Sequence, residues 1–289
     1  MNLNRPRRIA AIHDLSGFGR CSLAVICPAL SVMGMQVCPV PTAVLSTHTG
    51  GLGTVVSRDL TDYLAPTLEH YKSLALEFEC VYSGFLAGQA QFEHCRAFLT
   101  AYPDALRVVD PVLGDHGSAY RTVTDEMCRE MRSLVACADV ITPNLTEVAL
   151  LLGIDYPDDT LTAAQAKSLL VRLSELGPAN VVITGATLKL CGGLCNLGYD
   201  REHNRFWYTA NEHLPVSYPG TGDLFAAVLT GGLLRGDSLP IAMSRAAAFV
   251  EHAIRTTYSY DSDPRYGVMF EPLLPELAET GAGGEYHLL

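Results

Sequence analysis

The sequence predicts an α/β fold: a central, mostly parallel β-sheet flanked by helices on both faces, with a small antiparallel hairpin added to it. Short β-branched apolar runs alternate with longer segments of helical period, which is typical of parallel strands joined by crossover helices. The 289 residues are 48% hydrophobic and 18% charged, a balance that allows one large core. Two short apolar runs around a polar tract late in the chain predict the hairpin.

The strands are predicted from the apolar runs, in chain order. They cover residues 9–12, 80–83, 107–110, 139–142 and 180–184, with a further strand ending near Val44, and the hairpin joins residues 194–199 to 205–209. Several runs end in a small or polar residue: His13 and Asp14, Gly84, Asp110, Thr142 and Thr184. Because open parallel sheets bind ligands at the carboxyl ends of their strands, these positions are the first candidates for a site.

The helices are predicted between these strands. They cover residues 21–33, 59–78, 89–102, 124–137, 146–152, 162–176, 221–235 and 240–258. No repeat or linker divides the chain, so residues 1–278 are predicted to form a single domain. The small, polar stretch from Thr280 to Gly284 predicts a disordered tail over residues 279–289.

Charge and cysteine usage exclude several classes of protein. The formal net charge of -11 argues against nucleic-acid binding, since no basic stripe is present to contact phosphates. No apolar stretch has membrane-spanning length and the start lacks the order of a secretion signal, which predicts a cytoplasmic protein. The nine scattered cysteines predict buried free thiols. The lone pair Cys191 and Cys195 lacks the ligand count of a zinc site.

A glycine-rich turn opens the predicted helix at residue 221. Its residues are Gly220, Thr221, Gly222 and Asp223. Such a turn presents unpaired backbone N–H groups and the positive end of the helix dipole, which together bind an anion without a lysine. Asp223 beside that anion hole could accept the proton of an alcohol that attacks a phosphoryl group. The alternative is an ordinary aspartate that stabilises the first turn of a helix.

Four sequence blocks resemble the ribokinase superfamily, and its pyridoxal kinase branch in particular. They are residues 45–50 (LSTHTG), 110–115 (DPVLGD), 141–147 (ITPNLTE) and 220–227 (GTGDLFAA). The resemblance covers nearly the whole chain and implies a ribokinase-like homodimer. It implies a kinase that uses ATP and Mg²⁺ to phosphorylate pyridoxal, pyridoxine or pyridoxamine, with a monovalent cation such as K⁺ helping to hold the phosphates. The alternatives are a hydroxymethylpyrimidine kinase of the same superfamily and a non-catalytic protein that sequesters B6 vitamers.

The nucleotide side combines two kinds of residue. Asp110 and Asp115 bracket a turn where two carboxylates could orient a hydrated magnesium ion, or where an aspartate simply caps a loop. The resemblance implies that Asn144 faces the nucleotide phosphates and that Glu147 reaches Mg²⁺ through water. Their spacing also fits a helix capping box, and both interpretations can hold together. Thr184 and Gly185 close a strand where the family contacts nucleotide phosphate.

The substrate side is predicted around the first strand and two loops, with Asp14, Ser16, His48, Thr49 and Phe85 as its residues. The resemblance places Thr49 near the ring of the alcohol and an aromatic such as Phe85 against the pyridine. Phe85 could equally pack in the core, and His48 could equally be a structural histidine. Asp14 stands where relatives have a serine that contacts the pyridine nitrogen. A carboxylate there would favour the pyridinium form, unless it caps the next helix or bonds the amides of residues 16–19.

Overall fold

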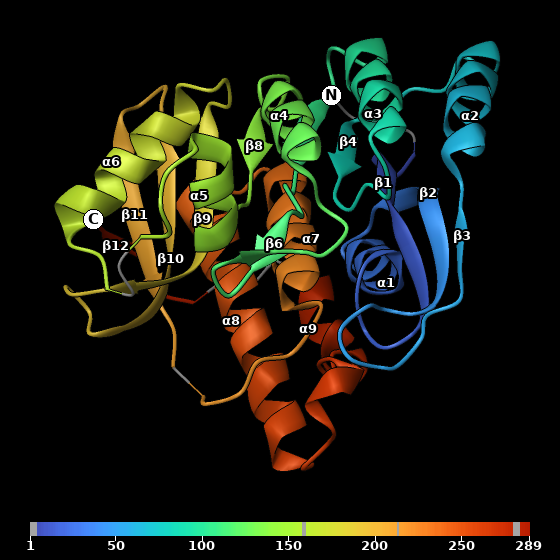
Figure 1. Cartoon of the computed structure of the whole chain (residues 1–289). Coiled ribbons are helices and arrows are strands. Elements are labelled where there is room, and N and C mark those ends of the chain that lie inside the picture. The colour runs from blue at the N-terminus through green and yellow to red at the C-terminus, as the bar shows by residue number, and fades with distance from the viewer. Residues whose placement is uncertain (1–4, 158–159, 213, 280–283) are drawn as a thin grey trace.

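The computed structural model describes residues 5–157, 160–212, 214–279 and 284–289. Within these ranges the chain forms a ten-stranded sheet between two helical layers (Figure 1). The strand order is β12-β11-β10-β9-β8-β5-β4-β1-β2-β3. The pairs from β2 through β1, β4, β5 and β8 to β9 are parallel, and the pairs at both ends of the sheet are antiparallel.

The central parallel strands β4, β5 and β8 are short and apolar, as the sequence pattern predicts, whereas β1, β2 and β9 are longer. The parallel strands are β1 (Arg8–Phe18), β2 (Gln36–Thr47), β4 (Cys80–Ser83), β5 (Leu106–Val109), β8 (Val140–Ile141) and β9 (Asn180–Leu188). The antiparallel strands are β3 (Ser57–Asp59), β10 (Gly193–Asp200), β11 (Arg205–Ala210) and β12 (His287–Leu288). The predicted hairpin is therefore present as β10 and β11. A separate two-stranded hairpin joins β6 (Gly114–Asp115) to β7 (Ser118–Ala119).

The helices divide between the two faces of the sheet. One face is covered by α2 (Thr61–Ser73), α3 (Ala90–Ala101), α4 (Asp125–Val135), α5 (Leu145–Leu152) and α6 (Ala163–Ser174). The other is covered by α1 (Leu23–Val32), α7 (Thr221–Arg235), α8 (Leu239–Ser259) and α9 (Leu274–Ala278), with short 3₁₀ turns η1 (Pro264–Tyr266) and η2 (Glu271–Leu273). Figure 1 shows α7 lying alongside α8 behind the sheet.

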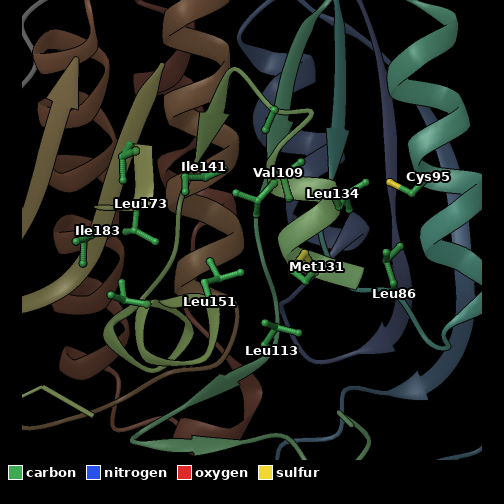
Figure 2. Packing of buried hydrophobic residues seen from close by; sticks show 14 of the residues in the cluster. Leu86, Cys95, Val109, Leu113, Met131, Leu134, Ile141, Leu151, Leu173 and Ile183 are labelled. Atoms are coloured by element: carbon green, nitrogen blue, oxygen red, sulfur yellow. The ribbon is translucent and has the colours of Figure 1, made fainter. Parts of the chain in front are cut away.

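Each face of the sheet has its own hydrophobic core. Figure 2 shows the core beneath α3 to α6, where strand residues such as Val109 and Ile141 pack against Met131 and Leu151. The opposite core joins the strands to α1, α7 and α8, and ten of the fifteen residues of α7 are buried. This burial fixes α7 in place and thereby fixes the glycine-rich turn at its start. The nine cysteines are free, and Cys21, Cys80, Cys95, Cys128 and Cys195 are buried.

The first two strands are longer than predicted. β1 continues from Ile12 to Phe18 and stays paired with β2, which continues to Thr47. His13 and Asp14 therefore lie within a strand and not at its end. Periodicity did not indicate this extension, because the strands continue past the apolar core and their outer halves are polar and partly exposed. A register shift of the β1–β2 pair falls between His13 and Leu15.

Two further predictions need correction. The helix expected from Asp59 begins at Thr61, because Asp59 belongs to β3 and its carboxylate accepts the Thr61 N–H at 2.8 Å. The tail predicted to be disordered contains β12. There the ring of His287 packs on Tyr208 with centroids 5.0 Å apart, and Leu289 packs against the core. Residues 280–283 lie outside the described residues. None of the described helices is both long enough and apolar enough to cross a bilayer.

Candidate active site

The glycine-rich turn has the geometry of an anion hole. Gly220 is the N-cap of α7 with φ of 79°, and a Cβ there would lie 1.9 Å from the carbonyl oxygen of Arg20, so only glycine fits. The first backbone bond of the helix runs from Leu224 N to Gly220 O at 3.0 Å. The N–H groups of residues 221–223 therefore have no partner inside the helix and are free to bind an anion at its positive end.

Gly222 is a glycine for a different reason. It lies inside α7, and its φ is not in the left-handed region. A Cβ built on Gly222 would meet no heavy atom within 4 Å. Backbone strain therefore does not require glycine here. The open space beside the first-turn amides is what a phosphate group approaching them needs.

The carboxylate of Asp223 is held on both oxygens. Oδ2 accepts the N–H of Ser22 at 2.7 Å, and Oδ1 lies 3.2 Å from Nε2 of His13. The side chain retains 13% exposure. Asp223 thus joins the start of α7 to β1 and to the entry of α1, segments about 200 residues apart in the sequence, while keeping a partly accessible carboxylate.

The sequence indicated His13 only as a polar residue at the end of a strand and gave it no role, yet it lies at the centre of this arrangement. Its Nδ1 is 2.8 Å from Oδ1 of Asp14, and Ser16 Oγ donates to Oδ2 of Asp14 at 3.0 Å. Burial alone would lower the pKa of His13, but the hydrogen bond to Asp14 and the carboxylate of Asp223 outweigh it and raise the pKa to about 10. Burial would likewise raise the pKa of Asp14, but the hydrogen bond and charge of His13 hold it below its usual value.

Two buried acids lie deeper in the site. Asp110 accepts the hydroxyl of Thr142 at 3.0 Å, and burial together with the charge of Asp223 raises its pKa to about 7. The pKa of Glu147 is raised well above its usual value by burial and by the charge of Asp110. Both carboxyl oxygens of Glu147 accept backbone N–H groups, from Asn144 at 2.9 Å and from Leu113 at 3.1 Å. The two buried acids therefore hold their protons more tightly than exposed carboxyl groups do.

Asn144, Thr184 and Gly185 share one edge of the sheet. Asn144 caps α5 through Oδ1, which accepts Glu147 N–H at 3.0 Å, so the predicted capping box is present. Asn144 and Thr184 form a parallel β-bridge. Gly185 has φ of 65°, and a Cβ there would meet no heavy atom within 4 Å. Thr184 and Gly185 lie within β9, which continues to Leu188, and not at the end of the strand as predicted. The open space at Gly185 leaves room for a ligand beside it.

Comparison with known proteins identifies this arrangement. The model of the phosphomethylpyrimidine kinase family matches residues 28–267. The chain belongs to this family. A pyridoxine/pyridoxal/pyridoxamine kinase of Bordetella bronchiseptica is 30% identical over 261 residues, covering 87% of this chain and 90% of that protein.

Two solved structures support the kinase assignment. A protein from Bacteroides thetaiotaomicron, in a crystal form with pyridoxal, is 42% identical and superposes with a TM-score of 0.93 over 99% of this chain and all of that one. The pyridoxal kinase of Lactobacillus plantarum is 33% identical with a TM-score of 0.86, covering 94% of this chain and 96% of that one. These matches confirm the predicted ribokinase-like fold and the prediction of a kinase. They overturn the alternative of a non-catalytic binding protein.

Asp115 is the most accessible acid in the site of this kinase. Its side chain is about half exposed, and Oδ1 accepts the N–H of His116 at 2.8 Å. The β6–β7 hairpin that carries Asp115 is tied to α5, since Asn144 Nδ2 donates to Gly114 O at 2.9 Å and Gly117 N–H donates to Thr146 Oγ1 at 2.8 Å. In the part of the chain that the structure describes, no three His, Cys, Asp or Glu side chains converge on a direct metal site.

The residues predicted on the substrate side of the kinase are spread over two regions. Asp14 and Ser16 are linked to Asp223 by His13, which contacts both aspartates. Half-buried Phe85 follows Gly84, which contacts the same histidine. His48 instead contacts the η1 turn. Nδ1 accepts Gly50 N–H at 2.9 Å, so Nε2 donates to Arg265 O at 2.6 Å. This contact supports the structural interpretation of His48. Thr49 is exposed on the same loop.

Proposed function

We propose that this kinase transfers the γ-phosphoryl group of ATP to the 5′-hydroxymethyl group of a vitamin B6 vitamer: pyridoxal, pyridoxamine or pyridoxine. The observation that carries the proposal is Asp223, a partly exposed carboxylate held beside the free amides of a helix N-terminus. The Bordetella and Lactobacillus relatives are named as kinases of B6 vitamers, and the Bacteroides protein was crystallised with pyridoxal, which supports this class of alcohol.

The geometry assigns one role to each part of the turn. The Asp223 carboxylate accepts the proton of the vitamer hydroxyl as its oxygen attacks the γ-phosphorus atom. The amides of residues 221–223 bind the phosphoryl oxygens, where charge accumulates during transfer. Gly220 makes the turn possible, and Gly222 leaves the space that the phosphoryl group occupies.

Asn144, Thr184 and Gly185 are proposed to contact the nucleotide phosphates, with Asp110 behind them. The acids fit a hydrated Mg²⁺ ion. Both oxygens of Glu147 already accept a backbone N–H, which favours an action on the ion through water, and the accessible Asp115 can act in the same way. When bound, Mg²⁺ offsets the negative charge of the polyphosphate among these acids. Because none of these site residues is a lysine, we include a monovalent cation such as K⁺ in the proposal.

Phe85 and Thr49 are proposed to contact the pyridine ring, with Ser16 and His48 supporting the walls of that pocket. Asp14 remains assigned to the substrate side. Its oxygens are directed at His13 and Ser16, which favours an indirect action on the vitamer over a contact with the ring nitrogen. The resemblance to pyridoxal kinases also supports a homodimer that acts in the cytoplasm, which sedimentation of the purified chain and fractionation of cells would test.

A second candidate substrate is hydroxymethylpyrimidine, because the family model that matches the chain is named for phosphomethylpyrimidine kinase. Both compounds are heteroaromatic alcohols of similar size. Parallel measurements of kcat/KM for pyridoxal and for hydroxymethylpyrimidine separate the two. We expect the higher value for a B6 vitamer, and a higher value for hydroxymethylpyrimidine would replace the proposal.

The decisive experiment is Asp223→Asn, assayed for vitamer-dependent ADP formation. We expect kcat to fall by about two to four orders of magnitude, the usual worth of a positioned general base. Binding of pyridoxal, followed by its absorbance, should persist because asparagine keeps the shape of the side chain. Asp237→Asn at the far end of α7, where Asp237 pairs with Arg245, is a control that leaves the turn intact. An unchanged kcat in Asp223→Asn would remove Asp223 from the mechanism.

A further inference from the structure

His13 is a buried cation among carboxylates at the reacting end of the site. Its side chain is 2% exposed, and its two ring nitrogens lie at 2.8 Å from Asp14 and 3.2 Å from Asp223. The charged and titratable groups that face it come from four elements: Asp14 on β1, Tyr82 on β4, Asp110 after β5 and Asp223 on α7. Three of these four groups are acids, so the imidazole experiences a strongly negative environment.

Packing fixes the imidazole ring in one place. The ring of His13 stacks over Tyr82 with centroids 6.5 Å apart and planes at 13°. Directly after β4, a Cβ on Gly84 would lie 2.0 Å from Cδ2 and 2.2 Å from Nε2 of His13. The ring therefore occupies the volume that a side chain at position 84 would need. Among the described residues its Nε2 atom has no hydrogen-bond partner of regular geometry, and Asp223 Oδ1 lies 3.2 Å away, at ion-pair distance.

We propose that His13 is a positioning residue for the catalytic base, forming with Asp14 a carboxylate–imidazolium–carboxylate chain that fixes the carboxylate of Asp223 in place. The proposal rests on the proposed role of Asp223. Asp14 orients the imidazole through Nδ1, Ser16 holds the second oxygen of Asp14, and Nε2 faces Asp223. The proton taken from the alcohol ends on a free lone pair of Asp223, and His13 keeps both ring protons throughout.

The charge state of His13 agrees with this arrangement. Its pKa is raised to about 10, because the two carboxylates outweigh burial. With a folded-state pKa above the unfolded value of 6.5, the ion pairs stabilise the fold fully below about pH 6.5, and that contribution is lost as pH rises through about 10. The ion pairs of His13 with Asp14 and Asp223 are therefore present throughout the neutral pH range.

Two variants test the proposal: His13→Gln, which removes the charge, and Asp14→Asn, which keeps the imidazole but removes one carboxylate. His252→Gln is the matched control, since His252 is half exposed and pairs with Glu276 on the surface. For His13→Gln we expect kcat to fall about 10- to 100-fold, the usual cost of losing an orienting partner, while KM for ATP changes less than about three-fold. The control should keep wild-type kinetics.

The pH dependence supplies a readout that a merely structural role would not move. In Asp14→Asn the pKa of His13 should fall, so the alkaline limb of the kcat profile moves to lower pH by about one unit or more. ¹⁵N NMR of histidine-labelled wild-type enzyme should show both ring nitrogens of His13 protonated at pH 8. A His13→Gln variant with wild-type kcat, a neutral His13 at pH 8, or an unmoved alkaline limb in Asp14→Asn would overturn the proposal.

The outcomes remain separable from a failure of the proposed function. If wild-type enzyme phosphorylates no B6 vitamer, the substrate assignment is wrong, and the NMR titration still decides the charge state of His13. If His13→Gln does not fold, Asp14→Asn carries the test. Loss of thermal stability in Asp14→Asn, with unchanged kcat and an unchanged pH profile, would mean that Asp14 and His13 have only a structural role. That outcome would contradict the proposal.

Discussion

Asp110→Asn should make the ligand-free enzyme more stable at alkaline pH. The carboxyl group of Asp110 is buried, and its pKa rises from 3.8 to about 7. Between these values the folded state holds a proton that the unfolded state has released. The free energy of unfolding therefore falls as pH rises from about 4 to about 7. Asparagine removes the buried charge and can still accept the hydroxyl of Thr142, which now donates to Asp110 at 3.0 Å.

The size of the effect follows from the shift. About three pKa units at about 1.4 kcal/mol each give an upper limit of about 4 kcal/mol. The shift of Asp110 depends partly on the neighbouring acids Asp223 and Glu147, so we expect less than this limit. The free energy of unfolding should rise by about 1–3 kcal/mol at pH 8, and by less toward pH 5. In a domain of this size each kcal/mol raises Tm by roughly 2–4 °C.

Urea and thermal unfolding at pH 5 and pH 8, without nucleotide, measure this gain. Asp115→Asn is the matched control, because it removes a neighbouring carboxylate that is about half exposed and should change stability by less than about 0.5 kcal/mol. An Asp110→Asn variant that is less stable than wild type at pH 8, or equally stabilised at both pH values, would refute the reasoning. The same variant should bind MgATP more weakly, if Asp110 serves the nucleotide site.

Three further outcomes are expected. Gly222→Val should raise KM for ATP and lower kcat, each on the order of ten-fold or more, while Tm stays near wild type because no atom lies within 4 Å of the new Cβ; normal ATP saturation would place the phosphates elsewhere. Glu147→Gln should raise the magnesium concentration needed for half-maximal activity and regain part of its activity in excess Mg²⁺, and activity persisting in excess chelator would contradict the metal's role. His48→Ala should lower the free energy of unfolding by about 2 kcal/mol, measured in urea, through loss of two hydrogen bonds, with kcat within ten-fold of wild type.

The alternating layers were predictable because they depend on local pattern. Residues 80–83 and 221–235 fold within the bounds that periodicity predicts, and Asn144 with Glu147 forms the capping box that their spacing indicates. These features need only the neighbouring sequence. The glycine-rich turn was predictable for the same reason, because its residue types indicate a turn at the start of a helix.

The parts that were missed depend on partners distant in the sequence. The extension of β1 to Phe18 requires β2 beside it, and β12 requires β11, so no local apolar pattern marks either strand. His13 looked like a residue at the end of a strand. Its role emerges only when α7, about 200 residues later, brings Asp223 to its other ring nitrogen. An adjacent histidine and aspartate in a strand were the one available signal.

The contact between His13 and Gly84 also has an evolutionary consequence. A Cβ at position 84 cannot coexist with the imidazole ring in its present place, because it would lie 2.0 Å from Cδ2. The two positions should therefore change together among descendants of a common ancestor. Lineages that keep the histidine should be confined to glycine at position 84, whereas lineages with a small residue at position 13 should be free to accept alanine or serine there. A tally of this residue pair across related genes would show whether the histidine has constrained the neighbouring strand throughout the divergence of these kinases.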